Sequence, residues 1–463
     1  MRKIHIRILI LGTVLFSCRP AGIIYSDQLK QLHANVIAYI SEDQPDPERV
    51  KELLGTIKED GSWKTIDYTS KERGGWPTAG HLSNLLNMAK AYQTKGSPFY
   101  HKKAVSEKIH RGLNFWLEHD FQCPNWWYPE IGVPMTLAPM MILMEAELSP
   151  EQMQKGIKIL DRAKIGMTGQ NKVWLSGNVL LKSLLLRDEA TIRKAATSIQ
   201  EELTVSTKEG VQPDWSYHQH GPQLQFGNYG LAYVDDMIQW ISMLRNTPFH
   251  FEESKVAILR NYMLEGQQWV TWKDKFDVTC CGRQLFPRAQ TSKAASLARH
   301  FRKMEGVDPE FAAAYKNAGQ WQTLSGNRNF WRSDYMVQRS PKYFLTVKTS
   351  SERTIGAETV NSENIQGYYM GDGATFLYRT QEEYDNIFPF WNFKKIPGVT
   401  AHQEDKPLPA LTSKENRNIS LFVGGVSNGE NGIAVMDYNR NGLKARKSWF
   451  MFRDAIICLG AGI

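Results

Sequence analysis

The segment from Pro213 to Gly230, PDWSYHQHGPQLQFGNYG, concentrates side chains that can transfer protons. It combines the imidazoles of His218 and His220 with phenols, among them Tyr229, and places amide side chains between them. Its glycines and prolines predict a loop, and loops on a rigid scaffold often carry binding and catalytic groups. The alternative interpretation is a polar turn between two helices, in which these side chains only satisfy one another.

Further polar and aromatic clusters stand beside predicted helices, so one face of a ring of helices could gather them. The candidate residues in these helix-flanking loops are Asn125, Trp126, Trp127, Asn171, Arg283 and Arg288, and the predicted β domain adds Glu358 and Asn361. Each has a plainer interpretation. Asn171 could be a helix N-cap, the arginines and Glu358 could be solvated charges, and the tryptophans could fill a core.

This set of side chains favours proton abstraction from carbon over hydrolysis. Glycoside hydrolysis normally uses two carboxyl groups that flank the scissile bond, and these loops offer no such pair. A phenol and an imidazole suit removal of a proton next to a carboxylate, followed by loss of the glycosidic oxygen. That reaction is β-elimination from a uronic acid.

Each group would have its own task in such an elimination. Asn171 would hydrogen-bond the uronate carboxylate and stabilise the enolate-like intermediate. Tyr229, as a phenolate, would take the C5 proton and then return a proton to the leaving oxygen. Because a free phenol has a pKa of about 10, we expect Arg283 to lower the pKa of Tyr229. His220 would share the base role or orient the carboxylate.

Composition is consistent with an acidic sugar polymer as partner. The chain has 463 residues, which favours two domains over one core. Its 14 tryptophans suit flat contacts with sugar rings, and its formal charge of +8 attracts polyanions. No long run of lysine and arginine is present, so we expect no nucleic-acid-binding tail.

The chain changes character near residue 330. From about residue 26 to 325, apolar residues recur at helical spacing, with one helix expected at 254–272, and the lack of a fixed repeat predicts an α/α toroid. Between 330 and 463, alternating β-branched segments and glycine turns predict an antiparallel β-sandwich, with strands at 343–349, 374–378, 419–423, 432–436, 447–452 and 455–459. The sequence stops directly after a strand. Either the β domain is short or the chain is truncated, so we expect an α+β multidomain protein with an incomplete toroid and an incomplete sandwich.

Residues 1–18 have the basic start and apolar core of a signal peptide. The protein is therefore expected to be exported, to the periplasm, the medium or the outer membrane. Leu15 to Cys18 also resembles a lipoprotein cleavage box, so a lipid anchor at Cys18 and a soluble mature protein both stay open. The other cysteines lack metal-ligand spacing, and we expect no zinc site, no cofactor and no disulfide framework.

Several strings together resemble polysaccharide lyase family 8, the family of chondroitin AC, hyaluronate and xanthan lyases. The most specific is QHGPQLQ at 219–225 with Tyr229 shortly after it. Others are NWW at 125–127, the TG pair before Asn171, GR at 282–283 and the segment from Glu358 to Asn364. The similarity runs from about residue 70 to the last residue. It implies a toroid, a β domain and eliminative cleavage of uronic-acid polymers.

The resemblance also implies a role for each matching position. Asn171 neutralises the carboxylate, His220 and Tyr229 transfer protons, Arg283 contacts the reacting region and Glu358 steadies that network. The NWW string joins the sugar-binding cleft, together with Arg288 and Asn361. Three features depart from the family pattern. The chain is shorter, Arg288 stands farther from Arg283 than in the usual arginine pair, and Gln170 replaces a small residue before Asn171.

The leading hypothesis is therefore a monomeric lyase acting on a glycosaminoglycan such as chondroitin sulfate or hyaluronan. The alternative is a non-catalytic polysaccharide-binding protein of a surface glycan-uptake system. A hydrolase on the same scaffold comes third because the carboxyl pair is absent.

Overall fold

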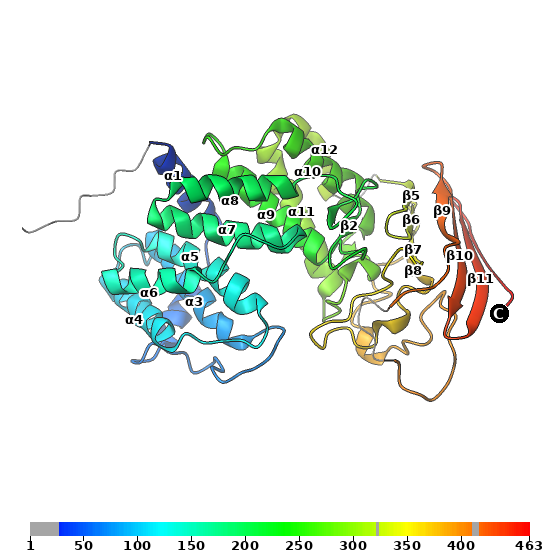
Figure 1. Ribbon diagram of the computed structural model, residues 1–463, viewed down its shortest axis with the longest axis horizontal. Coiled ribbons are helices and arrows are strands. Elements are labelled where there is room, and N and C mark those ends of the chain that lie inside the picture. The colour runs from blue at the N-terminus through cyan, green and yellow to red at the C-terminus, as the bar shows by residue number, and fades with distance from the viewer. Residues whose placement is uncertain (1–26, 321–323, 410–415) are drawn as a thin grey trace, which may run out of the picture.

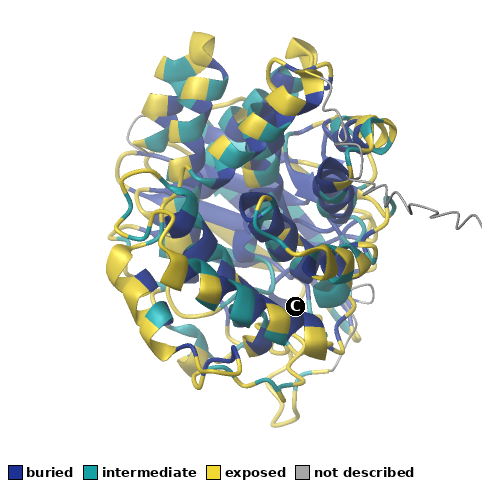
Figure 2. Cartoon of the chain, turned by 90° about the vertical axis from the view of Figure 1, so that its left-hand side faces the viewer, coloured by how far each residue is buried: buried dark blue, intermediate teal, exposed yellow. Residues whose placement is uncertain are grey.

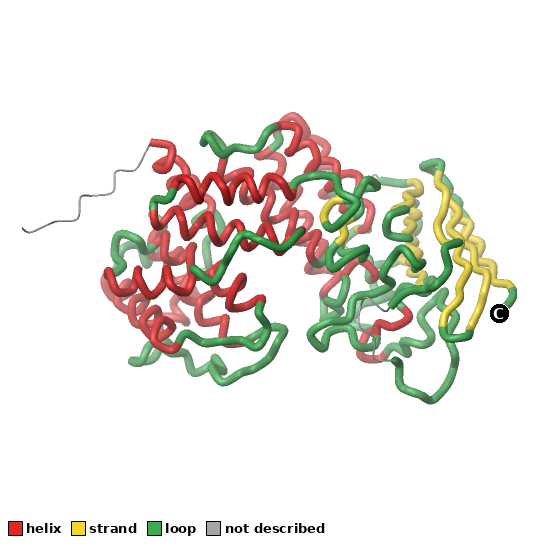
Figure 3. The backbone as a smooth tube through the Cα atoms, viewed as in Figure 1, coloured by secondary structure: helices red, strands yellow, loops and turns green. Residues whose placement is uncertain are grey.

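The computed structural model describes residues 27–320, 324–409 and 416–463. The expected signal segment, with Cys18, lies outside this part of the chain. Helices fill the N-terminal part of the molecule and antiparallel strands the C-terminal part, at opposite ends of its long axis (Figure 1, Figure 3). The predicted α+β class, a helical domain followed by antiparallel sheets, is confirmed.

The helical part is built from successive helix pairs. In chain order they are α1 (Asp27–Ile40), α2 (Pro47–Thr56), α3 (Gly80–Gln93), α4 (Lys103–His119), α5 (Val133–Leu143), α6 (Pro150–Leu160), α7 (Gly169–Leu186), α8 (Glu189–Glu202), α9 (Tyr229–Leu244), α10 (Glu253–Glu265), α11 (Ala289–Val307) and α12 (Ala312–Gly319). Helix α10 ends before Gly266, short of the residue 272 expected from the sequence, and a short turn and a hairpin follow it.

The helices form two concentric layers. Helices α1, α3, α5, α7, α9 and α11 all line one central cavity. Helices α4, α6, α8, α10 and α12 each pack on the outside of the preceding or following inner helix. Figure 2 shows the buried residues gathered toward the middle and the exposed ones on the peripheral helices. Because inner and outer helices alternate, consecutive inner helices run in the same direction, and their N-termini meet at one end of the ring.

Burial patterns explain which helix takes which place. Outer helix α4 buries Val105, Ile109, Leu113 and Trp116, a single apolar stripe. Inner helix α7 is buried along most of its surface, including Gly177, where the Trp240 ring leaves no room for a Cβ. A stripe suits a helix with one solvated side, and burial all round suits a helix between layers.

Two four-stranded antiparallel sheets follow. One contains β5 (Gly326–Phe330), β6 (Tyr335–Arg339), β7 (Phe344–Lys348) and β8 (Ala374–Tyr378), and the other contains β9 (Val423–Ser427), β10 (Gly432–Arg440), β11 (Leu443–Met451) and β12 (Ile456–Ala461), both in sequential order. Two-residue strands β1 (Gly210–Val211) with β2 (Tyr217–His218), and β3 (Thr271–Trp272) with β4 (Lys275–Phe276), make small hairpins in the loops.

The first sheet is buried on both faces, as the middle layer in Figure 1. Tyr335, Val337 and Phe344 belong to the core shared with the helices. Met336 and Leu345, on the opposite face, pack with Trp449 and other residues of the outer sheet. Alternation of side chains along a strand makes this double contact possible. No helix in the described residues is long and apolar enough to cross a bilayer.

The segment 419–423, expected to be a strand, is irregular until Val423. Its side chains Ile419, Leu421 and Phe422 are exposed. The guanidinium of Arg353 occupies the carbonyls of Leu421 and Val423 instead of a neighbouring strand. Strand β9 therefore begins where the expected strand ends.

Candidate active site

A pocket of about 430 Å³ lies at the end of the ring where the inner helices begin. The loops before α5, α7, α9 and α11 contribute to it, together with a loop of the β domain. Of the residues predicted from the sequence, its lining includes Asn125, Trp126, Trp127, Asn171, His220, Tyr229, Arg283 and Asn361. Glu358 lies directly behind this lining. Arg288 is exposed and does not line the pocket.

Asn171 is held in the first turn of α7. The helix starts after Thr168, and Gly169 has a φ of +58° and touches the Gln219 side chain where a Cβ would stand. Because Thr168 occupies the N-cap position, the interpretation of Asn171 as the cap is wrong. The Asn171 side chain is 4% exposed, and its Oδ1 has no hydrogen-bond partner among the described residues. The amide is thus placed to bind a ligand in the pocket.

His220 is fixed by a buried carboxylate. Its Nδ1 lies 2.7 Å from Oε1 of Glu358, which is 2% exposed. An ionised carboxylate only accepts hydrogen bonds, so Nδ1 carries a proton in this contact. Burial raises the pKa of Glu358, but the hydrogen bond from His220 and the charge of Arg283 outweigh it and lower the pKa. Glu358 is therefore ionised at neutral pH.

Arg283 joins two carboxylates at the pocket wall. Its Nε donates to Oε2 of Glu363 at 2.5 Å, and Nη1 forms an ion pair with Oε1 of Glu358 at 2.8 Å. The guanidinium lies 5.5 Å from the centre of the Tyr229 ring. Gly282, with a φ of +61°, supplies the turn that aims Arg283 inward.

Tyr229 opens helix α9 and faces both His220 and Arg283. Its ring is 4.8 Å from the His220 ring, edge to face. Burial raises the pKa of the phenol, the charge of Arg283 opposes this, and the charge of Glu358 raises it again. Arg283 does lower the pKa of Tyr229 as expected, but burial and the charge of Glu358 together outweigh the arginine, so the pKa is raised overall. Tyr229 is a neutral phenol in this structure.

Aromatic side chains form one wall of the pocket. Trp126 is 39% exposed, whereas Trp127 is half-buried and meets Trp174 edge to face at 5.5 Å. Asn125 uses its amide locally, since Nδ2 donates to the Arg73 carbonyl and Oδ1 accepts from the Trp127 backbone. Its side chain lines the pocket, but its amide is already hydrogen-bonded to the backbone of the loop.

Sequence reasoning did not single out Trp174, Tyr128, Arg73, Asn228 and Glu363, which also line the pocket. Trp174 could have been found, because it stands one helical turn after Asn171 and shares its face. Glu363 is the only carboxylate among the lining residues of the described chain, and it is paired with Arg283. The pocket therefore does not offer the carboxyl pair that hydrolysis normally needs.

Comparison with known proteins identifies the family of this chain. Residues 24–318 match the model of the polysaccharide lyase family 8 N-terminal alpha-helical domain, and residues 325–463 match the family 8 super-sandwich domain. The chain belongs to polysaccharide lyase family 8. This confirms the family predicted from the sequence strings.

Individual family 8 proteins are similar over most of this chain. Chondroitinase-AC of Pedobacter heparinus is 32% identical over 425 residues, which are 89% of this chain and 60% of that protein. Hyaluronate lyase HylB of Enterococcus faecalis is 25% identical over 85% of this chain and 47% of its own length. A chondroitinase AC lyase structure, studied as enzyme–oligosaccharide complexes, superposes with a TM-score of 0.87 at 29% identity, covering 94% of this chain and 67% of that one. The chain thus spans less than two thirds of the length of these two curated relatives.

Proposed function

We propose that this family 8 protein is a carbon–oxygen lyase that cleaves a uronic-acid polymer by β-elimination. One observation carries the proposal: an amide, an imidazole and a phenol line a single pocket in which the one carboxylate is already paired. Removal of the C5 proton leaves electrons that form the C4–C5 double bond, and the C4–oxygen bond breaks. The leaving oxygen then takes up a proton.

Asn171 is the group proposed to bind the uronate carboxylate. The C5 proton becomes more acidic as negative charge on that carboxylate is stabilised, and a buried amide can do this without bringing a competing charge. A single well-placed donor of this kind contributes on the order of 3–4 kcal/mol to the transition state. The free Oδ1 is compatible with either orientation of the amide, since oxygen and nitrogen are assigned from their partners.

Tyr229 and His220 are proposed to move the protons as a pair. A neutral phenol is the correct form to protonate the leaving oxygen. To act first as the base, Tyr229 must lose its proton, and in a neutral imidazole whose proton is held on Nδ1 by Glu358, Nε2 of His220 is the adjacent acceptor. Arg283 then stabilises the phenolate. His220 could equally take the C5 proton itself, with Tyr229 acting only as the acid.

The substrate class proposed is a glycosaminoglycan, chondroitin sulfate or hyaluronan. The relatives named for chondroitin and hyaluronate cleavage support this class, and so do the formal charge of +8 and the tryptophan wall. Trp126, Trp127 and Asn361 are proposed to contact the sugar, and Arg288 would do so only at the edge of the cleft. We also propose that the protein is exported and works as a monomer without a cofactor.

The deciding experiment measures the ultraviolet absorbance of the unsaturated uronate with chondroitin sulfates, hyaluronan, dermatan sulfate and xanthan. A rise with one polymer, lost in Tyr229→Phe while the polymer still binds, supports the lyase. Tight binding with no absorbance change would favour the alternative, a non-catalytic polysaccharide-binding protein.

A further inference from the structure

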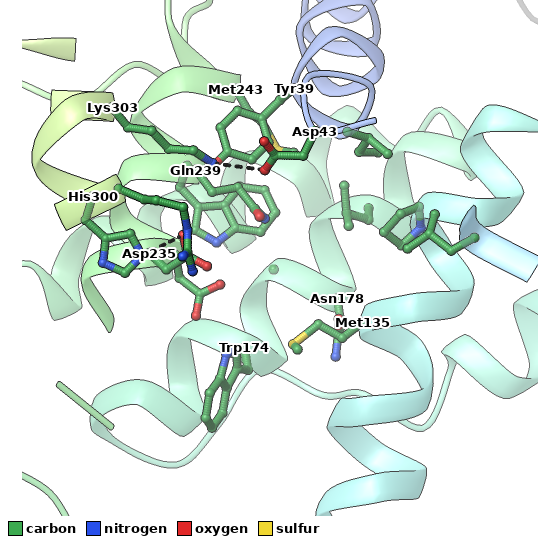
Figure 4. Close-up of a pocket in the computed structure, with 18 of the residues that line it drawn as sticks. Tyr39, Asp43, Met135, Trp174, Asn178, Asp235, Gln239, Met243, His300 and Lys303 are labelled. Atoms are coloured by element: carbon green, nitrogen blue, oxygen red, sulfur yellow. Dashed lines mark hydrogen bonds and ion pairs between the residues drawn. The ribbon is translucent and has the colours of Figure 1, made fainter. Parts of the chain in front are cut away.

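The central cavity of the ring adjoins the active-site pocket. It measures about 380 Å³ and is lined by the six inner helices (Figure 4). Two consecutive carboxylates of α9, Asp235 and Asp236, line it. Trp174 lines this cavity as well as the active-site pocket, so the two spaces share a wall.

Asp236 contacts Gln170 and Trp174, which stand before and after Asn171 in α7. Its Oδ2 accepts a hydrogen bond from Nε2 of Gln170, and its carboxyl is also hydrogen-bonded by the Trp174 side chain. Gln170 directly precedes Asn171 in α7 and is fully buried. Trp174 follows one turn later, and its ring lies 5.9 Å from Tyr229 and 5.5 Å from Trp127. One side chain outside the active site thus restrains both its amide and its aromatic wall.

The charge state of Asp236 fits this role. Enclosure by the inner helices raises its pKa well above the ordinary value, and the neighbouring charge of Asp235 raises it further. The hydrogen bonds from Gln170 and Trp174 oppose this rise in part. A raised pKa favours the neutral carboxyl, which adds no negative charge behind the site where a uronate would sit.

Asp235, the adjacent residue, makes different contacts. Its Oδ1 pairs with Nε2 of His300 at 3.1 Å, and its side chain is 57% exposed. Figure 4 shows Asp235 directed toward His300, with Trp174 below the pair. The two aspartates therefore form a matched pair in the same helix, of which one reaches the active-site wall and one does not.

We propose that Asp236 is a positioning residue of the active site, which aligns Asn171 and Trp174 through its hydrogen bonds to Gln170 and Trp174. The proposal rests on the proposed elimination reaction. Asp236 does not touch the pocket, so it acts only through these two residues. A displacement of a catalytic group by about 1 Å can lower a rate on the order of a hundredfold.

The test compares Asp236→Ala, Asp236→Asn and Asp235→Asn in the full chain, by turnover of the native polymer and of its uronate methyl ester. Asp236→Ala should lose on the order of a hundredfold in kcat on the native polymer. It should lose much less on the ester, which has no carboxylate charge for Asn171 to neutralise. Asp236→Asn, which resembles the neutral acid, and Asp235→Asn should stay close to the parent protein.

Equal losses on polymer and ester would reduce Asp236 to a merely structural residue, and an unaltered Asp236→Ala would overturn the proposal outright. If Asp236→Ala does not fold, Gln170→Met removes the same hydrogen bond from the other side and should show the same selective loss. If the parent protein shows no elimination, the proposed function fails separately. Calorimetry with the polymer then decides: weaker binding by Asp236→Ala than by Asp235→Asn retains the proposal, and equal binding overturns it.

Discussion

Replacing Glu358 by glutamine tests the charge network behind the active site most directly. The substitution keeps the size of the side chain and removes its charge. Glu358 accepts from Nδ1 of His220 at 2.7 Å and pairs with Arg283 at 2.8 Å, with only 1% of its side chain exposed. Two groups therefore lose their ionic partner at once.

The two losses affect different quantities. Removing one partner from a buried pair typically costs about 3–5 kcal/mol of unfolding free energy, because the other charge is left uncompensated. We expect about 3 kcal/mol for Glu358→Gln, since Glu363 still holds Arg283. For catalysis, the amide can donate to Nδ1 of His220 and so place the proton on Nε2. A wrong tautomer of a catalytic histidine costs on the order of 10⁴ in kcat.

The matched control is Glu363→Gln, the same change at the second carboxylate of the same arginine. Its side chain is 38% exposed, and an exposed pair of this kind contributes only about 0–1 kcal/mol. Denaturant unfolding gives the stability of both variants, and initial rates of product absorbance give kcat. Equal losses in the two variants, in stability and in kcat, would refute the role given to the buried charge.

Three further variants test other parts of the site and fold. Asn171→Ala should lower kcat/KM on the order of 10²–10³, with a smaller loss on the uronate methyl ester. Gly132→Ala should raise KM more than it lowers kcat, because the new Cβ would stand 2.6 Å from the Trp127 ring and displace it; unchanged steady-state kinetics would contradict this. His81 is fully buried, and burial lowers its pKa from 6.5 to about 4. Its contribution to stability is therefore complete above pH 6.5 and is lost as the pH falls toward 4, by about 3 kcal/mol in total; unfolding measured across this range should show a flatter pH dependence in His81→Gln.

The general architecture was readable from the sequence because its signals are local. Periodic apolar residues marked the helices, and residues 374–378 were expected as a strand where β8 is found. Strands β5 and β6 were missed, because GNRNF lacks an apolar alternation and YMVQR buries every residue between two layers. Alternation of apolar and polar residues reveals a strand with one solvent-exposed face, but it does not reveal a strand that is buried on both faces.

The sequence predicted which residues line the site better than it predicted their contacts and pKa values. The sequence motifs identified most of the residues that line the pocket. They did not show that the Asn125 amide is hydrogen-bonded to the backbone or that Arg288 is exposed to solvent. The pKa of Tyr229 also followed from burial that a sequence does not display. His218 and His220 stand two positions apart, yet His218 is buried against Ser333 of the β domain, with its pKa lowered by burial to about 3.

That contrast between the two histidines explains why the site needs both domains. His218 and Gln223, on either side of His220, join the β domain through a hydrogen bond to Ser333 and a strand-like bridge to Ile355. Ile355 leads within a few residues to Glu358, whose carboxylate fixes His220. The same docking contact therefore holds the loop that bears the imidazole and the loop that sets its tautomer. A helical ring alone would keep Asn171 and Tyr229 in place but would leave His220 and Arg283 without their ionic partner.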